Sequence, residues 1–448
     1  MRISKTLQPL AESAEISNAL KQHFLASLSL LYLRFPAACR DFNSFFKLLE
    51  SRLSNSFTQC AAIEALKQLS PRFSSMGLTA FAFSSLVEEF ILVITRSPSS
   101  QKSQCLKTLA RLIEDNLFLL KKEEYEKLIN LSLSHLSKVE DLSIASAAIE
   151  LLASLLVPSV IKNVPLTLFD TILQSIINFI HSDLSLAVLE TLKNCFIKLF
   201  ELKIHDFEGM FAELTNSLKS DTSLNYLVVA SKCCSVCSSS WGSDLAKRYA
   251  GLCITSVKSS SNDVQCFSIL LLGEIGSVYF SELGASIWET LIGYVDSDSD
   301  ALRESVSQAL GTIAKFHVEE LVPRILAVMK SPSLSNPIVI LRSLKIALES
   351  SEISTELAAS CFALLLSFVR HSDDGVKQEA CICVGKLCNL RFDQLWNSFV
   401  SWVKNPAPES RIASAVVLRY VLKRGTVIPR IEEILSLIMD SDIVCFNI

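Results

Sequence analysis

The sequence predicts an all-α fold in which repeated helical hairpins stack into a solenoid. Glycine and proline are both scarce, with 12 of each in 448 residues, and this disfavours turn-rich β architectures and glycine-loop enzymes. Hydrophobic residues make up 50% of the chain, which is ample for a core. A pattern of turn, apolar, polar, apolar and small apolar residues recurs along most of the chain. Together these observations favour helices that share one continuous core.

The recurring pattern is clearest in DSDSDALRESVSQALGTIA, residues 296–314, and HSDDGVKQEACICVGKLC, residues 371–388. Both segments place a glycine, Gly311 or Gly385, inside an expected helix. The equivalent position occurs ten times at an average interval of about 39 residues, close to the period of HEAT and armadillo repeats. We therefore expect one HEAT/armadillo-like superhelix of about ten to eleven hairpins over residues 1–448. The ten positions are Lys67, Arg111, Ala153, Lys193, Cys233, Gly273, Gly311, Lys345, Gly385 and Arg419.

Each repeat is expected to hold a first helix, a polar turn and a second helix. Around Gly311 these are ELGASIWETLIGYV at 282–295, the acidic turn 296–300, and a helix with apolar residues at helical spacing. Aspartates suit a helix N-terminus, so the acidic clusters near Asp296 and Asp373 are expected to be caps, the alternative being a solvated ridge. Prolines fit the turns, where a helix can start but not continue. They are Pro332, Pro337, Pro406 and Pro408.

The glycines inside second helices predict points of close helix packing. A glycine in a helix costs about 1 kcal/mol relative to alanine, so its recurrence at Gly273, Gly311 and Gly385 suggests that close packing offsets the loss. The alternative is three unrelated flexible positions.

The last expected helix, IPRIEEILSLIM at 428–439, carries an apolar stripe without a partner helix after it. We expect fraying, self-association or a bound partner at this edge, because each exposed large aliphatic side chain forgoes roughly 1.5 to 3 kcal/mol. The stripe is Ile428, Ile431, Ile434, Leu435 and Ile438.

Charge and cysteine usage narrow the class of protein. The 42 basic and 46 acidic residues give a net charge of -4, which disfavours nucleic acid and acidic lipid as partners. The chain shows no signal peptide and no uncharged apolar run of 18 residues, so we expect no membrane partner. The 14 cysteines are expected to be reduced and buried in a cytoplasmic or nuclear protein.

No catalytic, cofactor or metal site is expected. Cys234 and Cys237 form a CxxC, but the next cysteine, Cys253, lacks a ligand partner, so core packing is the better interpretation. The same holds for Cys381, Cys383 and Cys388. Three of the four tryptophans, Trp288, Trp396 and Trp402, fall in or beside first helices and are expected to pack, with partner contact as the alternative; the fourth is Trp241. The six histidines lie without triad or metal spacing at His23, His135, His181, His205, His317 and His371.

Residues from about 40 to 440 resemble the cullin-associated and neddylation-dissociated proteins, the TATA-binding-protein-interacting HEAT-repeat family, and the order of segments is specific from about 260 to 425. The resemblance lies in the order of several segments, from the LLLGEIG at Leu270–Gly276 through the ALG at Ala309–Gly311 to the LVPRIL at Leu321–Leu326. It continues through Ile340–Ser351, Asp373–Leu387 and Ser410–Leu422. Family members are much longer, so the chain is expected to be truncated at both ends relative to them.

The resemblance implies a non-catalytic scaffold that binds an unneddylated cullin, or a cullin-RING core, and competes with substrate adaptors. It implies no small-molecule substrate. The alternative is a generic HEAT-repeat scaffold or a transport-receptor-like adaptor. Partner contacts are expected on second-helix residues that face away from the apolar stripe, namely Glu304, Gln308, Gln378 and Arg411.

Overall fold

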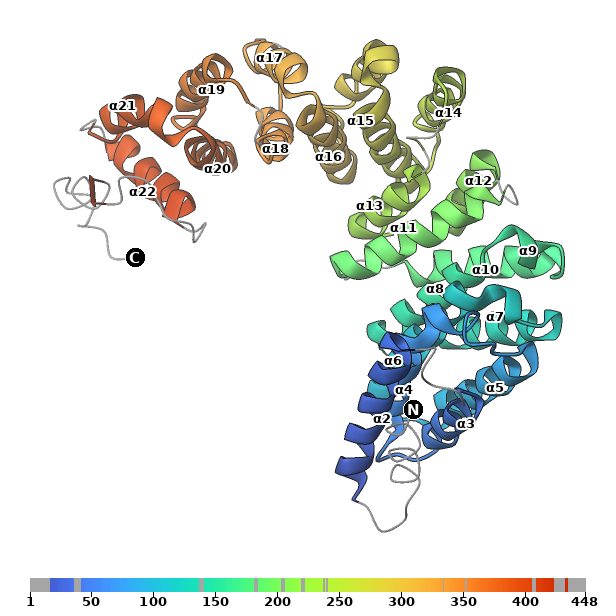
Figure 1. Ribbon diagram of the computed structural model, residues 1–448. Coiled ribbons are helices and arrows are strands. Elements are labelled where there is room, and N and C mark those ends of the chain that lie inside the picture. Colours follow the sequence, from blue (N-terminus) through green and yellow to red (C-terminus); the bar gives the residue numbers. More distant parts are fainter. Residues whose placement is uncertain are drawn as a thin grey trace. The chain divides into compact units, whose positions relative to one another are not determined.

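The structure is a computed structural model that describes most of the chain. It covers residues 17–35, 42–136, 141–180, 184–202, 206–218, 222–236, 238, 241–332, 334–350, 353–404, 408–422 and 432–433. Regular structure within these ranges is helical, without strands (Figure 1). The all-α prediction is confirmed. The chain divides into two compact units, Met1–Leu214 and Thr215–Ile448.

Helices of the first unit follow one another in the order that the repeat pattern predicts. Their bounds are α2 Asn18–Arg34, α3 Phe42–Leu53, α4 Gln59–Leu69, η2 Ser70–Arg72, α5 Ala80–Arg96, α6 Ser99–Asn116, η3 Leu117–Leu119, α7 Lys122–Leu136, α8 Leu142–Leu155, α9 Pro158–Ile161, α10 Leu166–Phe179, α11 Leu186–Glu201 and α12 Phe207–Ser217, which ends just past the division.

The second unit continues the alternation of first and second helices. Its helices are α13 Leu224–Ser235, α14 Ser243–Ser256, α15 Asn262–Ile292, α16 Asp300–Phe316, α17 Val318–Met329, α18 Pro337–Ala347, α19 Thr355–Phe368, α20 Asp374–Leu390, α21 Phe392–Val403 and α22 Pro408–Leu422.

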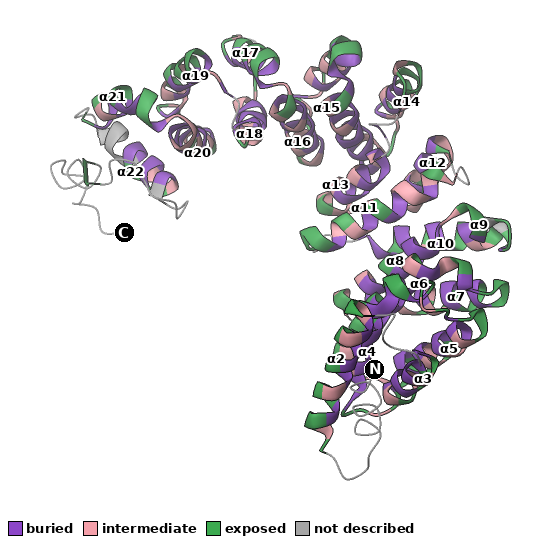
Figure 2. Cartoon of the chain, in the orientation of Figure 1, coloured by how far each residue is buried: buried purple, intermediate pink, exposed green. Residues whose placement is uncertain are grey.

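Both units are built from two layers of helices. Second helices pack on second helices of the next repeat, as α4 on α6 and α16 on α18, while first helices pack on first helices, as α17 on α19. Figure 2 shows the buried residues gathered between the layers and the exposed residues on the outer sides. The ten positions at the 39-residue interval fall one each in α4, α6, α8, α11, α13, α15, α16, α18, α20 and α22, which are all second helices. The repeat register is therefore confirmed.

The three glycines lie where successive second helices approach each other closely. A Cβ at Gly273 would lie 2.6 Å from the Ala309 Cα of α16, and one at Gly311 would lie 2.6 Å from the Ile346 Cβ of α18. At Gly385 it would lie 2.8 Å from the Tyr420 Cβ of α22. Side chains do not tolerate such distances without movement of a helix, so the predicted reason for these glycines is confirmed.

The first helix expected at 282–295 is present and ends at Ile292. A kink joins it to the second helix before it, and the two together form α15. Tyr279 alone takes a non-helical conformation there, with φ −115° and ψ 30°, which bends the helix without a loop. Its hydroxyl donates to the carbonyl oxygens of Ser238, at 2.6 Å, and Trp241. These hydrogen bonds hold the bend against the preceding repeat.

α15 is also the one described helix that is long and apolar enough to cross a membrane. Of its apolar window, 61% is buried inside the structure, because α13, α14 and α16 pack around it. Its hydrophobicity is that of a core helix.

The capping prediction holds at one acidic turn and fails at the other. Asp373 caps α20 by accepting a hydrogen bond from the Val376 N–H at 2.9 Å. α16 is instead capped by the Ser299 hydroxyl, which accepts from the Leu302 N–H at 3.3 Å. The Asp296 carboxylate accepts from the backbone N–H of Asn336 at 3.1 Å, and so joins two successive turns. Serine and aspartate are equally good caps, so composition alone did not separate them.

Two of the predicted turn prolines begin helices, Pro337 at α18 and Pro408 at α22. Pro332 lies in the turn before α18, and Pro406 lies outside the described residues. The uncovered stripe at Ile428, Ile431, Ile434, Leu435 and Ile438 also lies outside them.

Candidate protein-binding surface

Second helices of the second unit carry a network of ion pairs across three repeats. Arg342 of α18 pairs with Glu304 of α16 and, through Nε, with Glu379 of α20 at 3.2 Å. Lys345 adds a second contact to Glu379 at 2.8 Å. Burial opposes the charge of Arg342, but the two carboxylates outweigh it and raise the pKa of its guanidinium. We call these residues, with those of the next paragraph, the ion-pair ladder.

A second group of charges connects the same three helices toward their C-termini. The Glu349 carboxylate, in the turn after α18, forms ion pairs with Lys315 of α16 and Lys386 of α20, each at 3.2 Å. Burial would raise the pKa of Glu349, but the hydrogen bonds and charges of the two lysines lower it below its ordinary range. Lys386 also donates to the Lys345 carbonyl oxygen at 2.9 Å. The ladder thus spans α16, α18 and α20 with alternating charge.

The predicted contact residues occupy different places around the ladder. Glu304 belongs to it, and the Gln308 side-chain amide lies 3.5 Å from the Glu304 carboxylate. Both residues are half-buried, and part of their hydrogen-bonding groups is already engaged by other residues of the chain. Gln378 is exposed and lines a pocket between α20 and α22. Arg411 lies in α22, and its side chain is outside the described residues.

Sequence reasoning missed the other members of the ladder. Its charges of opposite sign recur 34 to 38 residues apart, at one repeat spacing, as in Glu304, Arg342 and Glu379. Alternating charges at equivalent positions of successive repeats were therefore the signal in the sequence. This charge pattern becomes visible only when successive repeats are aligned by charge as well as by apolar pattern.

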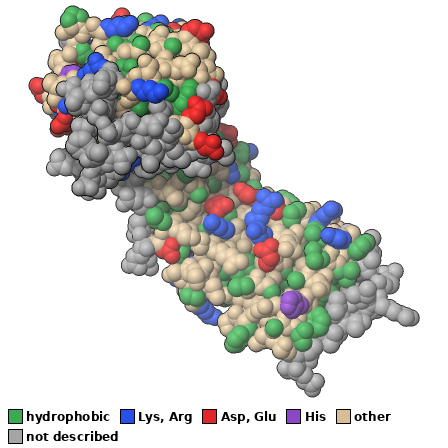
Figure 3. All heavy atoms as spheres, turned by 90° about the vertical axis from the view of Figure 1, so that its left-hand side faces the viewer, with side chains coloured by type: hydrophobic (Ala, Val, Ile, Leu, Met, Phe, Trp, Pro, Cys, Tyr) green, Lys and Arg blue, Asp and Glu red, His purple; other side chains and the backbone are tan. Residues whose placement is uncertain are grey.

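Positive and negative side chains also alternate on the one face of the molecule that Figure 3 shows. In Figure 3 the lysine, arginine, aspartate and glutamate side chains are interspersed, with no continuous field of one sign on this face. Such a surface lacks the basic stripe with which proteins bind nucleic-acid phosphates.

Two of the described histidines, His317 and His371, make contacts within their own and neighbouring repeats. The His317 Nε2 lies 3.1 Å from the Ser277 carbonyl oxygen, and its ring packs 5.2 Å from Phe280. His371 Nδ1 accepts from the Asp373 N–H at 3.1 Å. Within the described residues no group of three or more histidine, cysteine or acidic side chains could hold a metal ion. His181 and His205 lie outside these residues.

Ten of the eleven described cysteines are buried and pack as small apolar side chains, as predicted, whereas Cys60 is exposed and contradicts the expectation that all cysteines are buried. Cys233, Cys234 and Cys253 are buried, and Cys237 lies outside the described residues. Burial raises the pKa of the Cys388 thiol to about 12, which keeps it protonated and unreactive. Trp396 and Trp402 are each 6% exposed, so their predicted packing is confirmed.

Comparison of the sequence with known proteins shows a similarity to a cullin-associated protein. The chain is 22% identical over 425 residues to cullin-associated NEDD8-dissociated protein 1 of Arabidopsis thaliana. It resembles that protein. The match takes in 89% of this chain, and the chain spans 34% of the length of that relative. No protein-family model matches the chain.

Solved structures with a similar fold include the karyopherin Kap121p. The complex with the SUMO protease Ulp1p matches 94% of this chain and 45% of that chain with a TM-score of 0.58 and 14% identity. The complex with Pho4p matches 98% and 47%, with a TM-score of 0.56 and 14% identity. At such identity the likeness shows the fold, a HEAT-repeat solenoid. The chain is therefore a helical-repeat protein.

Proposed function

We propose that this chain is a non-catalytic scaffold that binds a cullin lacking its ubiquitin-like modifier and competes with substrate adaptors for it. The single observation that supports the choice of partner is the similarity to a cullin-associated NEDD8-dissociated protein over 89% of the chain. The proposal includes one solenoid over residues 1–448 and a cytoplasmic or nuclear location.

The geometry supports a surface for this binding. The ladder residues remain partly accessible, with side-chain exposures of 41% for Arg342, 48% for Glu349 and 31% for Lys386. Interspersed charges of this kind select partners by complementarity and orientation more than by raw affinity. We include Glu304, Gln308, Gln378 and Arg411 in the contact surface.

Competition would follow from coupled binding. Two proteins that bind one cullin and strain each other's contacts each weaken the other by the same factor, because the coupling free energy is shared. No bond is made or broken in such an exchange, so the activity needs neither a catalytic residue nor a cofactor.

A pull-down with the purified full chain tests the proposal. Bait chain is incubated with unmodified cullin-RING core, with the NEDD8-modified core, and with unmodified core plus excess substrate adaptor. We expect retention of the unmodified core alone and its loss in the other two samples. If no cullin is retained while a transport cargo or another scaffold client is, the alternative of a transport-receptor-like adaptor or generic scaffold replaces this proposal.

A further inference from the structure

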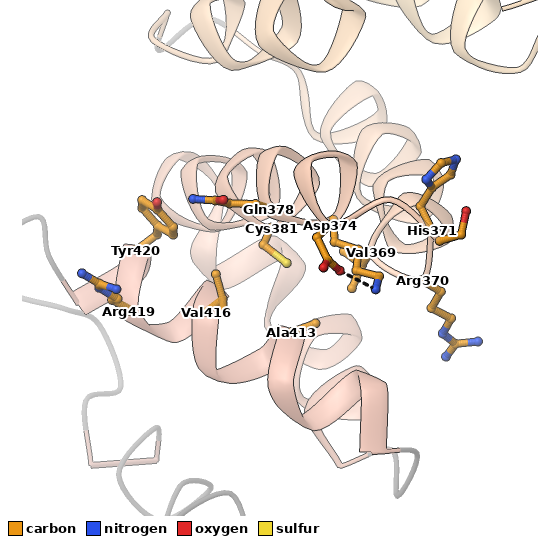
Figure 4. Close-up of a pocket in the computed structure, with 12 residues that line it drawn as sticks. Val369, Arg370, His371, Asp374, Gln378, Cys381, Ala413, Val416, Arg419 and Tyr420 are labelled. Atoms are coloured by element: carbon orange, nitrogen blue, oxygen red, sulfur yellow. Dashed lines mark hydrogen bonds and ion pairs between the residues drawn. The ribbon is translucent and has the colours of Figure 1, made fainter. Parts of the chain in front are cut away.

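A pocket of about 490 Å³ lies between α20 and α22 in the second unit. The two helices approach closely at Gly385 and Tyr420, and most of the pocket lies N-terminal to that contact. α20 contributes one helical face, through Asp374, Lys377, Gln378 and Cys381. Figure 4 shows Asp374, Gln378 and Cys381 on α20 opposite the labelled side chains of α22.

The floor of the pocket is apolar. Val369, Cys381 and Ala413 are buried, and Val416 stands half-buried among them. Small side chains at these positions leave space for one further aliphatic or aromatic side chain, and desolvated pockets of this kind hold the anchor residues of protein interfaces.

The rim of the pocket carries net positive charge. Asp374 is paired with Lys377 at 2.9 Å, and this contact lowers the pKa of its carboxyl group, so their charges cancel. Arg370 and Arg419 stand on opposite sides of the floor in Figure 4, and within the described part of the chain neither takes part in an ion pair. Two cations without an ion pair among the described residues therefore flank an apolar floor, although the whole chain carries a net charge of -4.

From this charge pattern we infer that the α20–α22 pocket binds an acidic peptide segment of a partner protein. One apolar side chain of the segment enters between Cys381, Ala413 and Val416, and flanking carboxylates pair with Arg370 and Arg419. Arginine suits this role because its planar group forms paired hydrogen bonds to a carboxylate. The inference does not depend on a cullin being the partner.

The test uses the full chain and fluorescence anisotropy with a fluorescein-labelled peptide of sequence DEDLEDE. Three further probes serve for comparison. In the serine probe, serine replaces the leucine; in the lysine probe, lysine replaces every acidic residue; and the third probe is a labelled ten-nucleotide RNA. We expect saturable binding of the first probe, with at least about fivefold weaker binding of the serine probe and none of the lysine probe.

Protein variants test the same contacts from the other side. The double variant R370E/R419E removes both arginine–carboxylate pairs and is expected to weaken binding roughly tenfold. Solvent partly screens each pair, which limits the loss to this size. The matched control is Arg72→Glu, which reverses an exposed arginine of the first unit and is expected to change the affinity less than about twofold. Circular dichroism establishes that each variant is folded.

Three results would overturn the inference. They are equal binding of the leucine and serine probes, binding of the RNA as tight as that of the peptide, or an equal loss in Arg72→Glu and R370E/R419E. The serine probe needs no altered protein, so its result stands even where a variant does not fold. If the chain does not retain cullin but binds the acidic peptide as expected, the cullin proposal is refuted and the assignment of the α20–α22 pocket to an acidic peptide stands.

Discussion

Replacing Gly273 by alanine tests the packing of successive second helices. The new Cβ would lie 2.6 Å from the Ala309 Cα, 2.8 Å from its Cβ and 3.1 Å from its carbonyl oxygen. Carbon atoms in contact normally stand about 3.5 to 4.0 Å apart, so α15 and α16 must separate by roughly 1 Å. Two of the three neighbouring atoms belong to the backbone and cannot rotate away.

The expected change in the free energy of unfolding is the difference between the cost of overpacking and the gain in helix propensity. Overpacking of this kind costs about 1 to 3 kcal/mol, and rigid backbone neighbours favour the upper part of that range. Alanine regains about 1 kcal/mol of helix propensity relative to glycine. We therefore expect Gly273→Ala to destabilise the protein by roughly 1 to 2 kcal/mol.

The matched control is Gly251→Ala in α14 of the same unit. Gly251 is exposed, and a Cβ there would meet no atom within 4 Å, so only the propensity gain of about 1 kcal/mol remains. Urea unfolding followed by circular dichroism should shift the midpoint down for Gly273→Ala and up for Gly251→Ala. Midpoints that rise in both variants would refute the close-packing explanation of the glycines.

Three further predictions concern charge and burial. Arg342→Ala should lower stability by about 1 kcal/mol, since Glu379 is 13% exposed and loses a partner, and unfolding in 1 M salt should show a smaller difference. Because the folded-state pKa of Glu349 is lowered, its contribution is present above its unfolded pKa and disappears as pH falls through the folded value. The urea midpoint of Glu349→Gln should thus lie slightly below that of the unaltered protein at pH 7 and converge with it as the pH falls below the folded-state pKa, whereas a constant gap would contradict the pKa direction. Iodoacetamide followed by mass spectrometry should label exposed Cys60 rapidly and buried Cys383 only on unfolding; equal rates would contradict the burial.

Apolar periodicity predicted the repeat architecture well because each repeat must bury the same stripe against its neighbours. The ten repeat positions and the role of Gly311 follow from that single requirement, and both are found. Local choices were harder to predict. Ser299 caps α16 instead of an aspartate, and serine and aspartate are about equally favourable caps. The bend at Tyr279 is accompanied by a hydrogen bond from its hydroxyl to the preceding repeat, a contact that local sequence does not reveal.

The candidate surface was less accessible to sequence reasoning than the fold. The sequence predicts a surface position for Glu304 because it faces away from the apolar stripe, and Glu304 does form an ion pair with Arg342. Its partner lies one repeat away, and helix periodicity within a repeat carries no information on such pairs. The α20–α22 pocket likewise depends on small side chains of two helices, Cys381 and Ala413, that are neighbours only after the repeats have stacked.

The most direct measurement is hydroxyl-radical footprinting of the full chain with and without unmodified cullin-RING core. Binding through the second helices predicts that side chains on α16, α18 and α20 lose reactivity in the complex while those on α17, α19 and α21 keep it. Protection confined to the first helices, or no change in either layer at saturating core, would contradict the account.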